Sequence, residues 1–161
     1  MSANPKPPSF IEATAAPTRT GSRYPKPHNL LCMARTKHLL GNVFGLTQFG
    51  VNLAILPPGC WSSQRHWHEQ QEEFIYVVSG ELVLVDDDGE HLLKPGTCAG
   101  FKANTGNGHH LKNMGDQTAQ YLEVGTRTKT EVAWYSDIDL KAEDSADGTS
   151  CYVRKDGSDA A

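Results

Sequence analysis

Apolar and polar residues alternate along most of the middle of the chain. Between residues 44 and 56, apolar side chains stand at every second position, among them Phe49, Val51 and Leu53. A period of two is typical of a β-strand that buries one face, because successive side chains of a strand point to opposite sides. A Pro-Pro-Gly run at residues 57–59 interrupts the alternation, so we expect the strand to end there.

Short apolar segments of the same kind recur at regular intervals after this strand. We expect strands at residues 64–68, 73–79, 81–85, 91–93, 97–101, 109–113 and 120–124. Glycine, proline, asparagine and aspartate stand between these segments, and such residues are typical of tight turns. Because helical periodicity is almost absent before residue 130, the pattern predicts an all-β domain, either an antiparallel barrel or a jelly roll.

The two ends of the chain differ from this middle part. Residues 1–28 contain six prolines among small polar residues, which favours an extended, weakly ordered arm. The alternative is a strand or arm that wraps a sister subunit. Toward the C-terminus the chain becomes acidic and irregular. We therefore divide the sequence into an N-terminal arm (1–28), a β-barrel domain (29–140) and an acidic C-terminal tail (141–161).

Length, charge and cysteine content narrow the class of protein. A chain of 161 residues is long enough for one hydrophobic core. The net charge of −4 and the scattered basic residues argue against a nucleic-acid partner. The sequence shows neither a secretory signal pattern nor eighteen consecutive apolar residues, so we expect a cytoplasmic protein without a membrane span. In a reducing cytosol the four widely spaced cysteines are expected to be buried apolar side chains.

Three histidines and a glutamate form the most specific chemical pattern in the sequence. His66 and His68 are two residues apart in a predicted strand, so both imidazoles project from the same face. Glu73 opens the next strand after a short turn, and His109 begins a later one. Three imidazoles and one carboxylate suit one divalent ion such as Zn, Mn, Fe, Ni or Co, and disfavour calcium, which prefers oxygen ligands.

These residues resemble the first sequence motif of the cupin superfamily. That motif reads G-x(5)-H-x-H-x(3,4)-E-x(6)-G. The chain is similar to it from Gly59, with one extra residue in the first gap, through His66, His68 and Glu73 to Gly80. The resemblance is to the small, single-domain members of the superfamily.

The second motif of the family reads G-x(5)-P-x-G-x(2)-H-x(3)-N. The chain is similar to it at both ends, where Gly89 precedes Pro95 and His109 precedes Asn113 at the expected distances. The resemblance covers about residues 45 to 125. It implies a double-stranded β-helix (jelly-roll) barrel, a divalent metal ion held at the four positions named above, a small-molecule ligand and a homodimer.

Glu72 and His110 stand next to predicted ligands, and neither is assigned to the metal. Glu72 competes with Glu73, because the shorter form of the first motif would select it. The six-residue distance to Gly80 and the phase of the strand favour Glu73. His110 alternates with His109, so we expect it to face outward and do not assign it to the metal.

A metal ion held by four protein ligands keeps open positions for oxygen atoms of a substrate. The most specific hypothesis is therefore a metal-dependent enzyme that acts on a small oxygen-rich molecule, with sugar-phosphate isomerase-like chemistry. A non-heme metal dioxygenase is one alternative on the same ligand set. A non-catalytic module that binds or senses a sugar or a carboxylate is the other.

The sequence does not clearly mark the proton carrier that an isomerase needs. Glu123, between apolar neighbours, and Tyr76 are candidates. A surface ion pair with Arg127 is the simpler interpretation of Glu123. The candidates for substrate binding are Arg65, Trp61 and Lys102.

Overall fold

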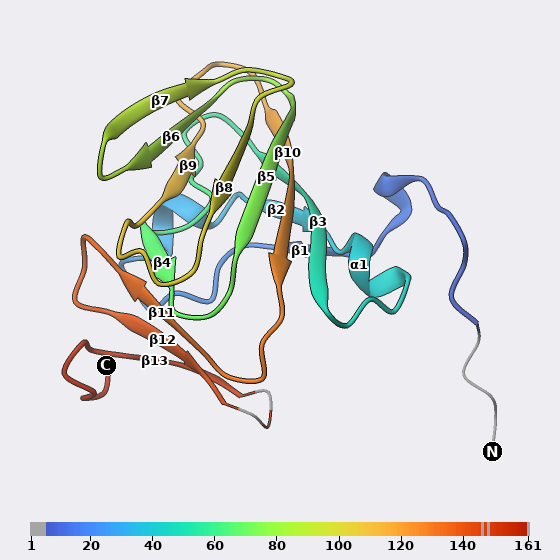
Figure 1. The fold of residues 1–161 in the computed structure, drawn as a ribbon. Coiled ribbons are helices and arrows are strands. Elements are labelled where there is room, and N and C mark those ends of the chain that lie inside the picture. The colour runs from blue at the N-terminus through green and yellow to red at the C-terminus, as the bar shows by residue number, and fades with distance from the viewer. Residues whose placement is uncertain (1–5, 146, 148, 161) are drawn as a thin grey trace.

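The computed structural model describes residues 6–145, 147 and 149–160, and these form an almost purely β structure (Figure 1). Every strand pair in it is antiparallel. None of the helices in these ranges is long and apolar enough to cross a membrane. The helices are η1 (Ala13–Ala15), η2 (Leu30–Cys32) and α1 (Leu40–Val43). The strands are β1 (Thr18–Thr20), β2 (Thr36–His38), β3 (Phe49–Leu56), β4 (His66–His68), β5 (Glu73–Ser79), β6 (Leu82–Asp86), β7 (Gly89–Leu93), β8 (Cys98–Phe101), β9 (His110–Lys112), β10 (Ala119–Thr126), β11 (Glu131–Tyr135), β12 (Lys141–Asp144) and β13 (Ser150–Val153).

Two sheets enclose the core of the barrel. The larger has six strands in the order β1-β2-β3-β10-β5-β8, and the smaller has three in the order β7-β6-β9. Strands far apart in sequence lie side by side, because β10 pairs with β3 on one edge and with β5 on the other. Figure 1 shows the two sheets facing each other in the upper half of the molecule. The fold is therefore the double-stranded β-helix that the sequence predicts.

Alternation along the strands explains which side chains fill the core. In β5, Ile75 and Val77 are buried, whereas Phe74, Tyr76 and Val78 point outward and are exposed. Strands β3, β6 and β10 likewise bury alternate side chains. Burial of one large aliphatic side chain contributes about 1.5–3 kcal/mol. The buried cluster comprises Ala54, Leu56, Cys60, Ile75, Val77, Leu82, Leu84, Leu93, Leu111, Ala119 and Tyr121.

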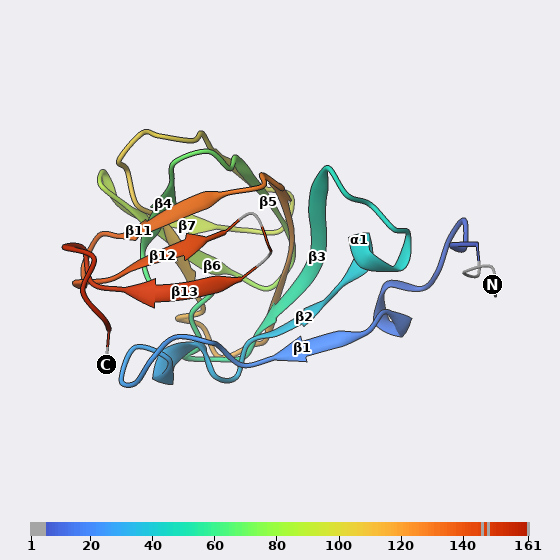
Figure 2. The same cartoon turned by 90° about the horizontal axis from the view of Figure 1, so that it is seen from below.

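The N-terminal segment forms part of the barrel wall. Strand β1 pairs with β2 of the same chain, with Arg19 opposite Lys37, and so extends the six-stranded sheet. The ring of Tyr24 packs against Tyr135 at a centroid distance of 5.3 Å and against Tyr152 at 5.5 Å. Figure 2 shows this segment running alongside β2 and β3. Within the described residues 6–28 the segment thus contains a paired strand and a packed tyrosine, while the order of the arm as a whole stays a prediction.

The C-terminal segment also differs from the expected irregular chain. Strands β11, β12 and β13 join β4 in a four-stranded sheet of order β13-β12-β11-β4 (Figure 2). In β11 the buried positions are Glu131, Ala133 and Tyr135. A glutamate at the first buried position hides the apolar alternation that would otherwise predict a strand. Because β4 carries His66 and His68, this sheet positions part of the candidate site.

The cysteines follow the prediction only in part. Cys32 and Cys60 are buried, as expected, whereas Cys98 on β8 and Cys151 on β13 are exposed. All four are free thiols. Strand pairing and apolar packing therefore hold the described part of the chain together without a disulfide.

Candidate metal centre

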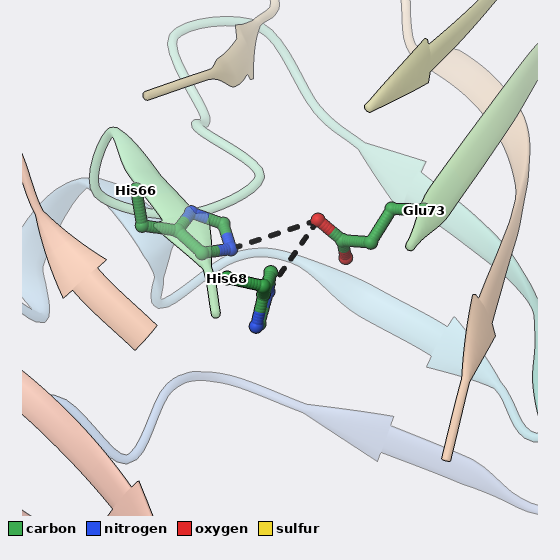
Figure 3. Close-up of side chains that lie close together, drawn as sticks. All are labelled: His66, His68 and Glu73. Atoms are coloured by element: carbon green, nitrogen blue, oxygen red, sulfur yellow. Dashed lines mark ion pairs between the residues drawn. The ribbon is translucent and has the colours of Figure 1, made fainter. Parts of the chain in front are cut away.

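Strand β4 presents two imidazoles to the barrel interior. His66 and His68 project from the same face of this strand, while Trp67 between them projects from the other. Strand β11 pairs with all three residues of β4. On its other side, the backbone of His66 exchanges two hydrogen bonds with that of His109, at 2.8 and 3.1 Å. Figure 3 shows both rings of β4 beside the carboxylate of Glu73.

Glu73, the first residue of β5, brings a carboxylate to these imidazoles. Its Oε2 atom lies 3.5 Å from Nε2 of His68 and 3.9 Å from Nε2 of His66 (Figure 3). The three side chains offer ligand atoms that all lie within 4.8 Å of one another. Glu72 is not a member of this group. Of the two adjacent glutamates, the structure thus brings Glu73 to the histidines.

The donor set fits one divalent metal ion. Zinc and similar ions bind imidazole nitrogen and carboxylate oxygen at about 2.0–2.2 Å, so two ligand atoms of one ion lie at most about 4.4 Å apart. The distances of 3.5 and 3.9 Å from Glu73 to the two imidazoles fall within this limit. These side chains can therefore share an ion with only small adjustments.

His109 reaches the same point through Glu73. Its Nε2–H donates a hydrogen bond of 2.9 Å to Oε2 of Glu73, the oxygen that also faces the other two imidazoles. The ring of His109 stacks on Phe101 at a centroid distance of 3.5 Å and lies 5.1 Å from the ring of His66. His109 lies outside the three-residue group defined above. All four side chains predicted from the sequence nevertheless meet at one carboxylate oxygen.

Hydrogen bonding and burial prepare His66 to act as a neutral ligand. Its Nδ1–H donates to the carbonyl oxygen of Gln64 at 2.9 Å, which leaves the Nε2 lone pair facing Glu73. Burial lowers the pKa of His66 to about 3, although the Glu73 carboxylate opposes this shift. The imidazole is therefore uncharged at neutral pH, as metal coordination requires.

Glu73 is ionised in the same surroundings. Burial alone would raise the pKa of its carboxyl group, but the hydrogen bond from His109 and the nearby His68 and His66 bring this pKa below its usual range. For His68, burial opposes protonation, whereas the carboxylates of Glu131 and Glu73 raise the pKa of the imidazole. Three imidazoles and one carboxylate would leave a charge of about +1 on a divalent ion, which favours an oxygen-rich or anionic ligand.

A second buried carboxylate, which sequence reasoning missed, holds the turn between β4 and β5. The side chain of Glu131 is buried, and it accepts hydrogen bonds of 2.7–3.2 Å from the backbone N–H groups of residues 69–71. It also lies 3.8 Å from Nδ1 of His68. Because this turn joins His68 to Glu73, Glu131 positions both. Its place in the burial pattern of β11 becomes visible only once that strand is known.

A cavity of about 340 Å³ lies against these side chains, and Glu123 on β10 also lines it. One carboxylate oxygen of Glu123 is 2.5 Å from Nζ of Lys37 and accepts a hydrogen bond of 2.8 Å from Nδ2 of Asn52. The hydroxyl of Tyr121 donates to the other oxygen at 3.3 Å. The expected surface pair with Arg127 is wrong, because that guanidinium binds the loop that follows α1 and a side chain of α1. Glu123 is instead an ionisable group inside the cavity.

Three other residues singled out from the sequence lie away from this cavity. Tyr76 is on the outer face of β5 and is 43% exposed. Arg65 forms ion pairs with Asp87 and Asp137 on the outside of the barrel. The ring of Trp61 packs edge-on against a side chain of β9. None of these three residues lines the cavity beside the candidate ligands.

Lys102 and His110 lie close to the candidate ligands but outside the cavity. Lys102 follows β8 and lines a narrow crevice that also touches Glu73. His110 is buried and does not face solvent, contrary to the expectation. Its Nδ1–H donates to the carbonyl of Ser63 at 3.0 Å, and burial lowers the pKa of the imidazole to about 4. The face of β9 opposite the candidate metal ligands is covered by Trp61, which explains the burial.

Comparisons with known proteins identify similar sequences and folds. The family model described as the cupin domain matches residues 52–125. A crystal structure of a sugar phosphate isomerase from a cupin superfamily, from Silicibacter pomeroyi, is 47% identical with a TM-score of 0.90. The similarity covers 94% of this chain and 96% of that chain. The protein therefore belongs to the cupin superfamily.

Other relatives share less of the chain. A structure from Acidithiobacillus ferrooxidans, named as a proposed sugar phosphate isomerase, is 28% identical with a TM-score of 0.70 and covers 75% of this chain and 76% of that one. The polyketide synthase CurC of Streptomyces cyaneus is 37% identical over 78 residues, which are 48% of this chain and 49% of that protein. The match thus spans about half the length of this curated relative.

Proposed function

We propose that this protein is a metal-dependent isomerase of small sugar phosphates, with His66, His68, Glu73 and His109 as the metal ligands. The meeting of these four side chains beside a polar cavity is the observation that carries the proposal. The 47% identity to the sugar phosphate isomerase of Silicibacter pomeroyi supports the choice of reaction. A bound divalent ion, Zn, Mn, Fe, Ni or Co, supplies positive charge that polarises a substrate carbonyl and makes the adjacent C–H group more acidic.

We assign Glu123 as the proton carrier. Aldose–ketose isomerisation moves a proton between two neighbouring carbons, so it needs a base that reaches the substrate without being a metal ligand. Glu123 lines the same cavity as the ligands, and the contacts with Lys37 and Asn52 hold its carboxylate in place. Tyr76, the other candidate from the sequence, is outside the cavity and receives no role.

The proposed reaction is balanced without a co-reactant. The carboxylate of Glu123 takes the proton from the carbon next to the carbonyl, and the carboxyl group returns it to the former carbonyl carbon. A second proton passes from the hydroxyl oxygen to the carbonyl oxygen. The substrate is therefore rearranged with no net oxidation, and the protein returns to its starting protonation state.

Proton exchange tests this assignment directly. The metal-loaded protein is incubated in deuterated water with a panel of aldose and ketose phosphates, and exchange and isomerisation are followed by NMR. We expect Glu123→Gln to lower kcat by about 10²–10⁴-fold with unchanged metal content. Glu81→Gln, which alters an exposed carboxylate paired with Lys94, is the matched control and should keep full activity. If the wild-type protein neither exchanges nor isomerises any compound of the panel, the proposed reaction is wrong.

Further measurements with the same protein and panel of compounds separate the two alternatives. Iron as the native ion, together with oxygen consumption in the presence of a substrate, identifies a dioxygenase. Tight binding of a sugar or a carboxylate without turnover identifies a binding or sensing module. Metal analysis of the purified protein and calorimetry with the same panel provide both readouts.

We also propose that the protein works in the cytoplasm as a homodimer. Phe74, Tyr76 and Val78 form an exposed apolar row on the outer face of β5, which a second copy would cover. The exposed thiols of Cys98 and Cys151 suit a reducing compartment. Light scattering coupled to size exclusion tests the dimer, and Tyr76→Lys is expected to shift it toward monomer.

A further inference from the structure

The N-terminal part of the chain adds a group of positive charges to the cavity of the candidate metal centre. Arg19 on β1, Arg23 after it, and Arg35 just before β2 all line this cavity. A second cavity of about 150 Å³ is lined by the same three arginines together with residues 20–22. The three guanidinium groups therefore stand where the two cavities meet, and we call them the arginine group.

Both carboxylates in the cavity form their ion pairs with groups other than the arginines. Glu123 is paired with Lys37 at 2.5 Å, and Glu73 faces the imidazoles of the candidate metal ligands. No other carboxylate is among the described residues that line this cavity. A positive surface thus forms at the solvent-exposed border of the cavity, where Arg19 and Arg23 stand, in a protein whose net charge is −4. Such a local field attracts anions to the cavity.

The side chains of Arg19 and Arg23 are available to a ligand. Among the residues that the structure describes, no carboxylate lies within ion-pair distance of either guanidinium. Arg19 also stands directly opposite Lys37 in the pairing of β1 with β2. Like charges at directly opposed positions destabilise a sheet. Burial, together with the nearby Arg35 and Arg23, lowers the pKa of Arg19, as expected where positive charges crowd together.

Hydrogen bonds to the backbone hold Arg35, one member of the arginine group, in place. Its guanidinium donates to the backbone carbonyl oxygen of Ser62 and, at 3.0 Å, to that of Gly21. In return, the N–H of Gly21 donates to the carbonyl of Arg35 at 2.9 Å. These two neutral carbonyl oxygens hold the Arg35 guanidinium in position without cancelling its positive charge. The turn that carries Arg23 is thereby fastened to β2.

We propose that Arg19, Arg23 and Arg35 form a phosphate-binding subsite for the phosphomonoester end of the substrate. Guanidinium groups bind phosphate oxygens in a bidentate manner, and the positive charge of three of them exceeds the two negative charges of a phosphate dianion. The subsite borders the cavity of the candidate metal ligands, so one sugar phosphate can reach both. The identity of the substrate rests on the proposed isomerase function, whereas phosphate binding itself does not.

Calorimetry with inorganic phosphate tests the subsite on the full chain. The protein is first freed of metal, because phosphate can also bind a metal ion directly. We expect the wild-type protein to bind phosphate and the double variant Arg19→Gln/Arg23→Gln to bind it at least about tenfold more weakly. Each single variant should show a smaller loss. The control Arg154→Gln alters an exposed arginine beside Asp139, away from both cavities, and should bind like the wild type.

The outcomes separate the subsite from the proposed reaction. Absence of phosphate binding to the wild type, or equal binding by the double variant, overturns the subsite. Phosphate binding that depends on the two arginines, with no isomerisation of any sugar phosphate, keeps the subsite and rejects the reaction. Isomerisation of a sugar phosphate with an unchanged KM in the double variant keeps the reaction and rejects the subsite. His68→Ala should lose the metal but still bind phosphate, which shows that the two parts of the site are independent.

Discussion

The buried carboxylate of Glu131 lies 3.8 Å from Nδ1 of His68 and also holds the backbone of the turn that leads from His68 to Glu73. One side chain on β11 thereby fixes the distance between two candidate ligands on β4 and β5. Groups that orient metal ligands in this way change metal affinity when they are altered, although they do not touch the ion.

We expect Glu131→Gln to weaken metal binding by about 10–100-fold. The amide that replaces one carboxylate oxygen is a donor, so it cannot accept the N–H groups that this oxygen now binds. Competition titration with a chromogenic chelator measures the affinity. Glu143→Gln on the adjacent β12, a half-buried partner of Lys141, is the control. An unchanged affinity in Glu131→Gln would show that the turn keeps its shape without this carboxylate.

The choice between the two adjacent glutamates can be tested with a matched pair of variants. Glu73→Gln removes the anionic ligand and should reduce bound metal severely, because a neutral amide oxygen is a much weaker donor to a divalent ion. Glu72→Gln removes the same charge one residue earlier and should retain the metal. Elemental analysis after dialysis gives the stoichiometry. Equal losses in both variants would contradict the assignment of Glu73.

The buried His110 predicts a specific acid sensitivity. Burial lowers its pKa to about 4 in the folded protein, whereas an unfolded histidine titrates near about 6.5. The unfolded state therefore binds more protons than the folded state between these pH values. The contribution of the neutral His110 to the free energy of unfolding is fully present above about pH 6.5 and decreases as the pH falls toward 4. In His110→Gln, which does not titrate, the loss between pH 7 and pH 5 should be smaller by about 2 kcal/mol.

Urea unfolding at the two pH values measures this difference, and the other histidines are common to both proteins. Lys112, Asp137 and Arg65 are the charged groups that act on His110, and both proteins contain them. Identical pH dependence in the two proteins would show that His110 becomes protonated without unfolding.

Two glycines of the first motif have similar backbone angles but different surroundings. Gly59 has φ +76 and Gly80 has φ +71. A Cβ atom on Gly80 would lie 2.7 Å from Cα of Ala119, whereas one on Gly59 would meet nothing within 4 Å. Each change to alanine should cost about 1–2 kcal/mol for the left-handed conformation, and Gly80→Ala about 1–3 kcal/mol more for the collision. Denaturant unfolding compares the two, and equal losses would show that the turn at Gly80 moves aside freely.

The sequence predicts the barrel well because its strands alternate strictly. Strand β5 is found at the predicted residues 73–79, and the same-face rule places His66 and His68 together. The spacing to Gly80 selects Glu73, which the structure brings to both imidazoles. Local periodicity was sufficient at these positions because each side chain is directed by its own strand.

The parts that the sequence did not predict depend on long-range pairing. Strand β11 contains a buried glutamate, and its partner β4 lies more than sixty positions earlier in the chain. Proline-rich composition concealed the pairing of β1 with β2, and with it the position of Arg19 beside the cavity. Arg65, the basic residue nearest to the motif, forms ion pairs with two aspartates and does not line the cavity. Tertiary contacts decide which charged side chains form ion pairs, and the sequence pattern alone does not show these contacts.

The edge position of β1 has a consequence for how this protein can diverge. The candidate metal ligands lie on or beside strands whose register is set by the closure of the barrel, so an insertion or shift there would displace several of them at once. Arg19 lies instead on a border strand that is joined to the sheet by three residue pairs. Exchange of this short border segment would therefore change the proposed anion subsite and leave the candidate metal ligands in place.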